Sequence, residues 1–161
     1  MNNLNSQSFP LSDRTLYYDT GKSILLCTDA ESEKKIWAKK FHGLSIIRDI
    51  IEDRDRFYVS FETDDYSGNY FALNRNNGNT EWDIPGRACF NIIHDNQLYV
   101  IFIDSEQDHY LLSINRYNGS KLWHHRVDDD LAEYNFRKNH VVLSYLSGKT
   151  EKISLADGRE L

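Results

Sequence analysis

The chain repeats one short phrase that ends in tryptophan, and this repeat limits its possible folds more than any other feature. In the two clearest copies, residues 70–82 and 111–123, a run of large apolar residues leads into Asn-Arg-x-Asn-Gly, and a second run then carries Trp. A more divergent copy spans residues 25–37, and a shortened one occupies residues 152–161. The chain therefore contains four copies of one unit.

Each copy predicts a β-hairpin. Apolar residues before the turn show the two-residue period of a half-buried strand, and Asn-Gly tolerates the positive φ of a tight turn. A Trp just after the turn places a large ring where it can fill the space between two packed sheets. The three tryptophans, Trp37, Trp82 and Trp123, lie 45 and 41 residues apart, a period typical of four-stranded propeller blades.

The pattern Leu-x-x-hydrophobic-Asn/Asp-x-x-x-Gly-x-x-x-Trp resembles the repeat of quinoprotein (PQQ)-like β-propellers. Such repeats occur in quinoprotein dehydrogenases and in propeller scaffolds that are not enzymes. The resemblance covers most of the chain. It implies the blade architecture and carries little information on activity, because function depends on sites added to a fold.

We therefore expect an all-β chain with essentially no helix, an incomplete (half) β-propeller of about four blades whose first and last blades are partial. The 161 residues hold three to four blades, whereas propellers have four to eight, so an open arc is favoured over a small closed ring. Residues 1–12 are expected to be a loose lead-in before a first blade that lacks its innermost strand. The blades, in one domain, are expected at residues 14–41, 44–84, 87–127 and 131–161.

Composition is that of a globular domain with a real core, with 40% apolar, 13% aromatic and 27% charged residues. The first ten residues have no basic stretch followed by an apolar one, and no apolar run is long enough to cross a membrane. A cytoplasmic protein without a signal peptide is therefore expected. Cys27 and Cys89 lie in apolar, strand-like contexts and are expected to be buried free thiols.

Acidic residues cluster in three segments that the blade model places on one face. These segments contain nine carboxylates, and the net charge of the chain is −6. The opposite face, with the hairpin tips Arg75 and Arg116, is mixed in charge. A charge run is often only a solvated loop, but here three separate runs fall on one predicted face. This face would repel nucleic acid and attract a basic protein. The residues expected to bind such a partner are Asp64, Asp65, Tyr66, Asp104, Glu106, Asp108, Asp128, Asp129 and Asp130.

An enzymatic role is not expected. The sequence has no Gly-x-Ser-x-Gly elbow, no phosphate-binding glycine loop and no Cys-x-x-Cys. It also has no adjacent cysteines, which many quinoprotein dehydrogenases possess, and too few blades for a complete ring. His124 and His125 are adjacent on a predicted strand and therefore point to opposite faces, so they do not form a metal pair. No catalytic residue, metal or cofactor is expected.

Two classes of function remain. The chain resembles, in architecture, the half-propeller immunity proteins of contact-dependent growth inhibition (toxin/immunity) systems. That resemblance implies a cytoplasmic toxin inhibitor that covers the active site of a cognate toxin, expected to be a basic nuclease domain, without binding nucleic acid or a membrane. The alternative is a propeller scaffold or adaptor in a larger assembly, with the open flanks as its working surface. The neighbouring gene distinguishes them: a toxin gene immediately upstream favours the first.

Overall fold

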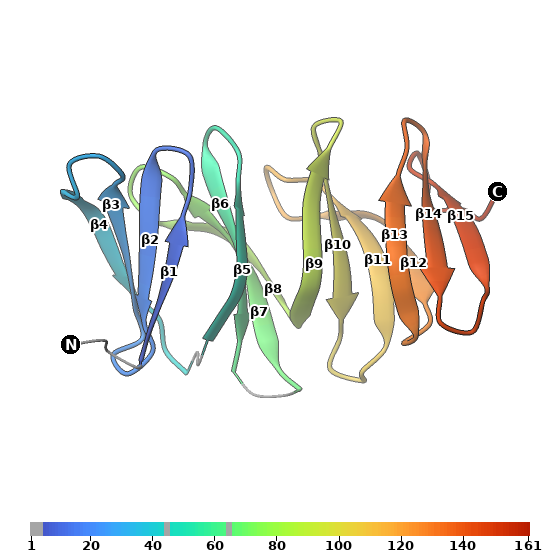
Figure 1. Ribbon diagram of the computed structural model, residues 1–161, viewed down its shortest axis with the longest axis horizontal. Helices are drawn as coiled ribbons and strands as arrows, with labels where there is room; N and C mark the ends of the chain where they lie inside the picture. The colour runs from blue at the N-terminus through green and yellow to red at the C-terminus, as the bar shows by residue number, and fades with distance from the viewer. Residues whose placement is uncertain (1–4, 44–45, 64–65) are drawn as a thin grey trace. The chain divides into compact units, whose positions relative to one another are not determined.

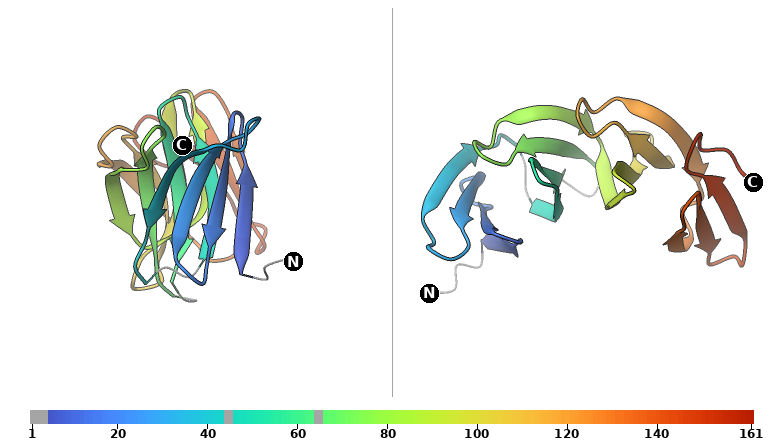
Figure 2. Two further views of the ribbon diagram at one scale, coloured as in Figure 1. Left: turned by 90° about the vertical axis from the view of Figure 1, so that its left-hand side faces the viewer. Right: turned by 90° about the horizontal axis from the view of Figure 1, so that it is seen from above.

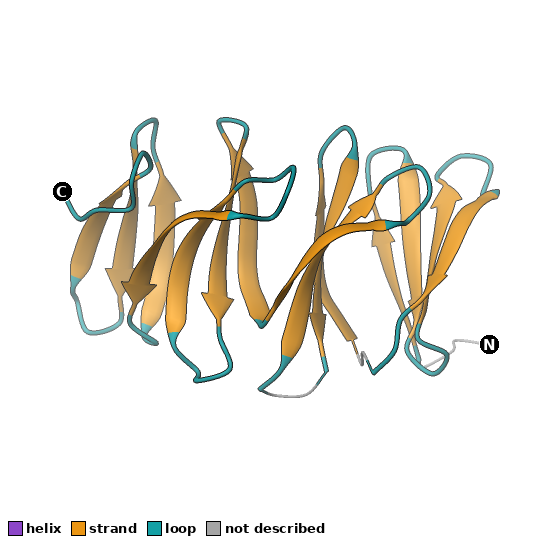
Figure 3. Ribbon diagram, turned by 180° about the vertical axis from the view of Figure 1, so that it is seen from behind, coloured by secondary structure: helices purple, strands orange, loops and turns teal. Residues whose placement is uncertain are grey.

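The computed structural model describes residues 5–43, 46–63 and 66–161. These residues form fifteen β-strands and no helix (Figure 3). They therefore contain no helix with the length and apolar character of a membrane span. The chain divides into two compact units, residues 1–87 and 88–161. We describe each unit by itself.

Unit 1 contains two four-stranded antiparallel sheets, each a simple meander in which the strands follow their order in the sequence (Figure 1). The strands of the first sheet are β1 (Ser6–Pro10), β2 (Arg14–Asp19), β3 (Ile24–Asp29) and β4 (Lys35–Lys40). Those of the second are β5 (Ile46–Glu52), β6 (Arg56–Glu62), β7 (Gly68–Asn74) and β8 (Thr80–Pro85).

Unit 2 contains one four-stranded and one three-stranded antiparallel sheet, again in sequence order (Figure 2). The strands of the third sheet are β9 (Arg87–His94), β10 (Gln97–Ile103), β11 (His109–Ile114) and β12 (Lys121–Val127). Those of the fourth are β13 (Leu131–Phe136), β14 (His140–Tyr145) and β15 (Thr150–Ser154). The all-β prediction and the partial last blade are confirmed.

The prediction of a partial first blade was wrong. Residues 6–10 lie within the expected lead-in, yet they form β1, which pairs with β2 from Ser6–Asp19 to Pro10–Thr15. The side chain of Gln7 also binds the next sheet, since its amide donates to the carbonyl of Ile47 and accepts from the Ile47 N–H, at 2.7 and 2.8 Å. An amide side chain thereby makes the contacts of a strand backbone, which explains how a polar segment is held in place.

The four turns of the repeat share one hydrogen-bond pattern. The turns begin at Asp29, Asn74, Asn115 and Ser154, where the backbone N–H bonds to the carbonyl five residues on and the carbonyl accepts from the residue four on. In each copy the side-chain oxygen of the first residue also accepts the N–H two residues on. The fifth residue has φ between 57° and 73° in all four, and it is glycine in three and Glu33 in the first. The turn chemistry thus recurs even where the sequence has diverged.

Two of the three repeated tryptophans, Trp37 and Trp123, join neighbouring sheets within their unit. In unit 1, Trp37 is buried, and its indole N–H donates to the carbonyl of Arg75 in the next sheet at 2.9 Å. In unit 2, Trp123 donates in the same way to the carbonyl of Leu155 at 3.1 Å. Trp82 is also buried and packs against Tyr58 and Tyr70 of its own sheet.

Arg75 belongs to the packing of unit 1, although the sequence places it at an exposed hairpin tip. It is only 8% exposed, and its guanidinium pairs with Glu52 and with Asp13 of the first sheet. The guanidinium also lies over the ring of Phe57, 5.0 Å from its centroid. The prediction that Arg75 presents a surface charge was therefore wrong, because two carboxylates and an aromatic ring enclose it.

Candidate protein-binding site

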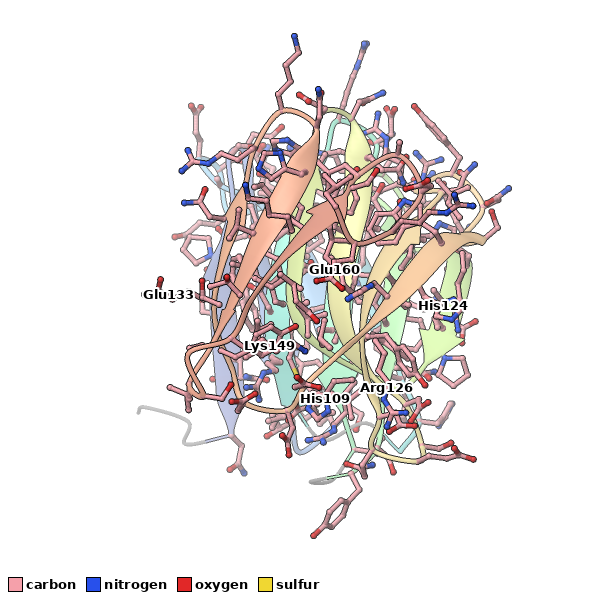
Figure 4. The ribbon with its side chains drawn as sticks, turned by 90° about the vertical axis from the view of Figure 1, so that its right-hand side faces the viewer. His109, His124, Arg126, Glu133, Lys149 and Glu160 are labelled. Carbon is pink, nitrogen blue, oxygen red and sulfur yellow. The ribbon has the colours of Figure 1, made fainter. Side chains whose placement is uncertain are left out.

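Three loops of unit 2 meet around a pocket of about 460 Å³. They are the β10–β11 loop, the β12–β13 loop and the β14–β15 loop. Figure 4 shows His109, Arg126 and Lys149 near one another at this end of the sheets. The pocket is lined by Gln107, Asp108, His109, Arg126, Val127, Asp128, Asp129, Asp130 and Ser147.

The β10–β11 loop is shaped by one of its own carboxylates. Asp104 accepts the backbone N–H groups of Glu106 and Asp108, at 2.9 and 3.0 Å. Asp108 forms an ion pair with Arg126 of β12. Only the carboxylate of Glu106 has no hydrogen-bond or ion-pair partner among the described residues, and Glu106 is exposed. This loop therefore presents fewer unpaired charges than its sequence indicates.

The β12–β13 loop contains three consecutive aspartates with different environments. Asp128 lies 2.8 Å from the ammonium of Lys149. Asp130 accepts the N–H of Ser147 at 2.9 Å and so holds the β14–β15 loop in place. Within the described part of the chain, the exposed carboxylate of Asp129 has no ion-pair or hydrogen-bond partner. Of the three aspartates, Asp129 is therefore the one whose carboxylate is available to bind a cation of another molecule.

A buried carboxylate, Glu151, holds Lys149, the cation that pairs with Asp128 of the pocket. Glu151, 7% exposed, accepts the hydroxyl of Tyr145 and pairs with Lys149 at 2.8 Å. Burial would raise the pKa of Glu151, but the hydrogen bonds from Lys149 and Tyr145 outweigh it and hold the pKa below its usual value. Burial, together with Glu151, raises the pKa of Tyr145, and the hydrogen bonds to Asp128 and Glu151 raise that of Lys149. Lys149 therefore stays charged and anchors both carboxylates.

A smaller, apolar groove of about 250 Å³ continues from the acidic pocket. The two share His109 and Asp129. Along the groove, the rings of Phe90 and Tyr134 lie with centroids 3.9 Å apart. The groove is lined by Cys89, Phe90, Ile101, His109, Asp129, Leu131, Ala132 and Tyr134.

The predicted binding residues fall into three groups. Asp108, Asp128, Asp129 and Asp130 line the pocket, and Asp104 and Glu106 lie in one of its loops. Tyr66 lies in unit 1 and is 68% exposed. Asp64 and Asp65 lie outside the described residues.

Sequence reasoning missed the cations of the site. Arg126 and Lys149 lie among the acidic residues and each pairs with at least one of them. The sequence offered one sign of these cations near the acidic residues. Arg126 stands two residues before Asp128, and Lys149 stands two residues before Glu151. Even so, five carboxylates outnumber these two cations, since four aspartates line the pocket and Glu151 pairs with Lys149. The pocket therefore keeps an excess of negative charge. In the described ranges, no three His, Cys, Asp or Glu side chains gather as a metal-ligand set.

Comparison with known proteins shows the fold and leaves the activity open. No protein-family model matches the chain, and no curated protein matches its sequence. The chain is similar in structure to BamB from Moraxella catarrhalis, with a TM-score of 0.70 and 15% identity over 92% of this chain and 48% of BamB. It is also similar to the computationally designed protein Ika8, with a TM-score of 0.68 and 13% identity over 96% of this chain and 46% of Ika8.

An enzyme occurs among the similar structures as well. The quinohemoprotein alcohol dehydrogenase ADHIIG from Pseudomonas putida HK5 matches with a TM-score of 0.65 and 10% identity, over 96% of this chain and 33% of the enzyme. The chain thus spans about half or less of these three proteins. These neighbours are propeller proteins, and the fold of the chain is that of an incomplete β-propeller. Because the fold occurs both in a dehydrogenase and in a designed protein, it carries no activity by itself.

Proposed function

We propose that the protein is a non-catalytic inhibitor, an immunity protein that binds a cognate basic toxin domain in the cytoplasm and covers its active site. The observation that carries this proposal is the acidic pocket of unit 2, where two hairpin loops and the connection between β12 and β13 meet and four aspartates line the wall. The two cations beside them, Arg126 and Lys149, pair with only two of these aspartates. The resemblance to half-propeller immunity proteins supports it.

The charge of the pocket suits a nuclease as the target. A nuclease must hold a polyanion, so its active site is basic. Loops fixed by Asp104 and Asp130 present carboxylates without the cost of ordering flexible segments on binding. Such a surface blocks access to the active site without chemistry of its own.

The test uses the two carboxylates that can be removed without disturbing the fold. Asp129 and Glu106 are exposed and have no partner among the described residues, whereas replacing Asp128 and Asp130 also breaks contacts to Lys149 and Ser147. The variant Asp129→Asn/Glu106→Gln should slow association with the product of the neighbouring gene and flatten the dependence of the on-rate on salt. Pull-down and association kinetics over a salt series measure this, because such attraction is screened within about 10 Å at 0.1 M salt.

The matched control removes the same charge elsewhere in unit 2. Glu133 and Glu160, both labelled in Figure 4, are exposed and line none of the pocket. The variant Glu133→Gln/Glu160→Gln should slow association less. Equal on-rates in the two variants would place the interface elsewhere on the chain. Failure to bind any toxin would favour the alternative role as a scaffold or adaptor.

A further inference from the structure

The groove next to the acidic pocket differs chemically from the rest of this surface. It combines an apolar wall, formed by Phe90, Leu131 and Tyr134, with one carboxylate, Asp129, which lies together with His109 where groove and pocket meet. The Phe90–Tyr134 ring pair provides an aromatic surface, and Tyr134 is 43% exposed. A side chain that fills this groove must therefore be apolar along its length and cationic at its end.

The local contacts also make Asp129 the carboxylate to which such a cation would bind. Arg126 is paired with Asp108, and Lys149 is paired with Asp128 and Glu151. Asp130 is engaged by the Ser147 N–H. In the part of the chain that the structure describes, neither Arg126 nor Lys149 pairs with Asp129, so an incoming cation need not displace either of them.

We infer that this groove is a socket for one arginine side chain of a protein partner, with the guanidinium on Asp129 and the alkyl stem along Leu131 and Tyr134. Arginine fits better than lysine for two reasons. Its planar guanidinium pairs with a carboxylate through two hydrogen bonds, and it stacks on aromatic rings. Its stem also buries against apolar surface while the charge stays at the mouth. The inference rests on the proposed function for its partner and names the contact that would give that interface its specificity.

A direct test uses a small probe and needs no toxin. N-acetyl-arginine amide is titrated into the ¹⁵N-labelled full chain, and backbone amide shifts are followed by NMR. The neutral isostere N-acetyl-citrulline amide serves as the matched ligand control. The arginine probe should shift the amides of His109, Asp129, Leu131 and Ala132, and the citrulline probe should bind roughly tenfold more weakly, since it loses the charge-assisted pair.

Variants assign the contact to its residues. Asp129→Asn should weaken binding of the arginine probe roughly tenfold, and Tyr134→Ala should weaken it as well. Glu160→Gln, which removes an exposed carboxylate outside the groove and the pocket, should leave it unchanged. The same spectra show whether each variant is folded.

The outcomes separate the socket from the proposed function. Equal shifts with citrulline, equal weakening by Glu160→Gln and Asp129→Asn, or no shifts at the groove would overturn the socket. A chain that binds the arginine probe there but binds no toxin keeps the socket and loses the immunity role. If the toxin binds Asp129→Asn as tightly as the parent chain and the arginine probe does not bind, the immunity role stands and the socket is wrong.

Discussion

Gly158 lies directly under the indole of Trp123. A β-carbon placed on Gly158 would be 2.4 Å from Cε3 of Trp123, far inside van der Waals contact. The same relationship recurs in unit 1, where a β-carbon on Gly78 would be 2.6 Å from Cε3 of Trp37. Glycine is therefore needed at these two turns for two reasons. It adopts the positive φ of the turn, and its lack of a β-carbon leaves room for the tryptophan ring of the preceding sheet.

We predict that Gly158→Ala destabilises the protein more than Gly148→Ala. Both glycines have positive φ, 73° and 87°, but a β-carbon on Gly148 meets no atom within 4 Å. Gly148→Ala should cost only the backbone strain, about 1 to 2 kcal/mol. Gly158→Ala should cost roughly 1 to 3 kcal/mol more, because the Trp123 ring must move. Urea unfolding measures both, and equal losses would mean that the ring adapts freely.

Arg75 should be among the most sensitive polar positions of unit 1. Arg75→Leu leaves the carboxylate of Glu52 without its cation in a partly buried site, which typically costs about 3 kcal/mol or more. Adding Glu52→Gln should restore part of the loss, and a double-mutant cycle of unfolding free energies measures the coupling. Lys22→Ala, which removes the exposed pair with Asp19, should cost less than about 1 kcal/mol. Additive effects of Arg75→Leu and Glu52→Gln would contradict a stabilising ion pair between Arg75 and Glu52.

The two cysteines should differ sharply in reactivity. Cys27 is buried, and burial raises the pKa of its thiol to about 11, so almost no thiolate forms near neutral pH. Cys89 is exposed on β9. A thiol reagent such as DTNB should therefore label one cysteine in the native protein and two after unfolding. Native Cys89→Ser should show no rapid labelling, and rapid labelling of that variant would place Cys27 at the surface.

Acid should destabilise the protein in part through Glu151. Its folded-state pKa lies below the ordinary value of 4.5, because the hydrogen bonds from Lys149 and Tyr145 outweigh burial. Its contribution is therefore fully present above that value and is lost as pH falls through the folded-state pKa. Glu151→Gln should lower the unfolding free energy at pH 7 by about 1 to 3 kcal/mol and flatten its decline between about pH 5 and pH 3. Glu133→Gln, an exposed change on β13, should leave the pH profile of urea midpoints unaltered, and so should not reproduce the effect.

The sheets could be predicted from the sequence because the turn signal is local. An Asp, Asn or Ser at the start of the turn and a residue with positive φ four positions later set the hydrogen bonds of each hairpin. β1 could not be predicted, because its place depends on pairing with β2 and on the Gln7 contact to Ile47, forty residues away. Cys89 was expected to be buried from its apolar neighbours, but β9 is an edge strand of its sheet and leaves the thiol exposed.

The candidate site could be predicted in part. The blade model placed three acidic runs on one face, and two of them, in the β10–β11 and β12–β13 loops, meet at the pocket. The sequence did not reveal which carboxylates are already engaged. The pairs Asp108–Arg126 and Asp128–Lys149 join residues 18 and 21 positions apart, and they depend on how neighbouring strands are aligned. Nor did it reveal that Asp130 holds the β14–β15 loop through the N–H of Ser147.

The meander order of the sheets has a consequence for how the chain is made. Each described strand pairs only with the strand just before or after it in the sequence. The described sheets can therefore form without a strand from a distant part of the chain. Closing such short loops costs little entropy, and β-proteins slow down when their pairings span long stretches of chain. Each hairpin can therefore form soon after it leaves the ribosome. The tryptophan of one sheet can pack only after the glycine turn of the next sheet has formed. We therefore expect assembly to proceed from the N-terminus, one sheet at a time.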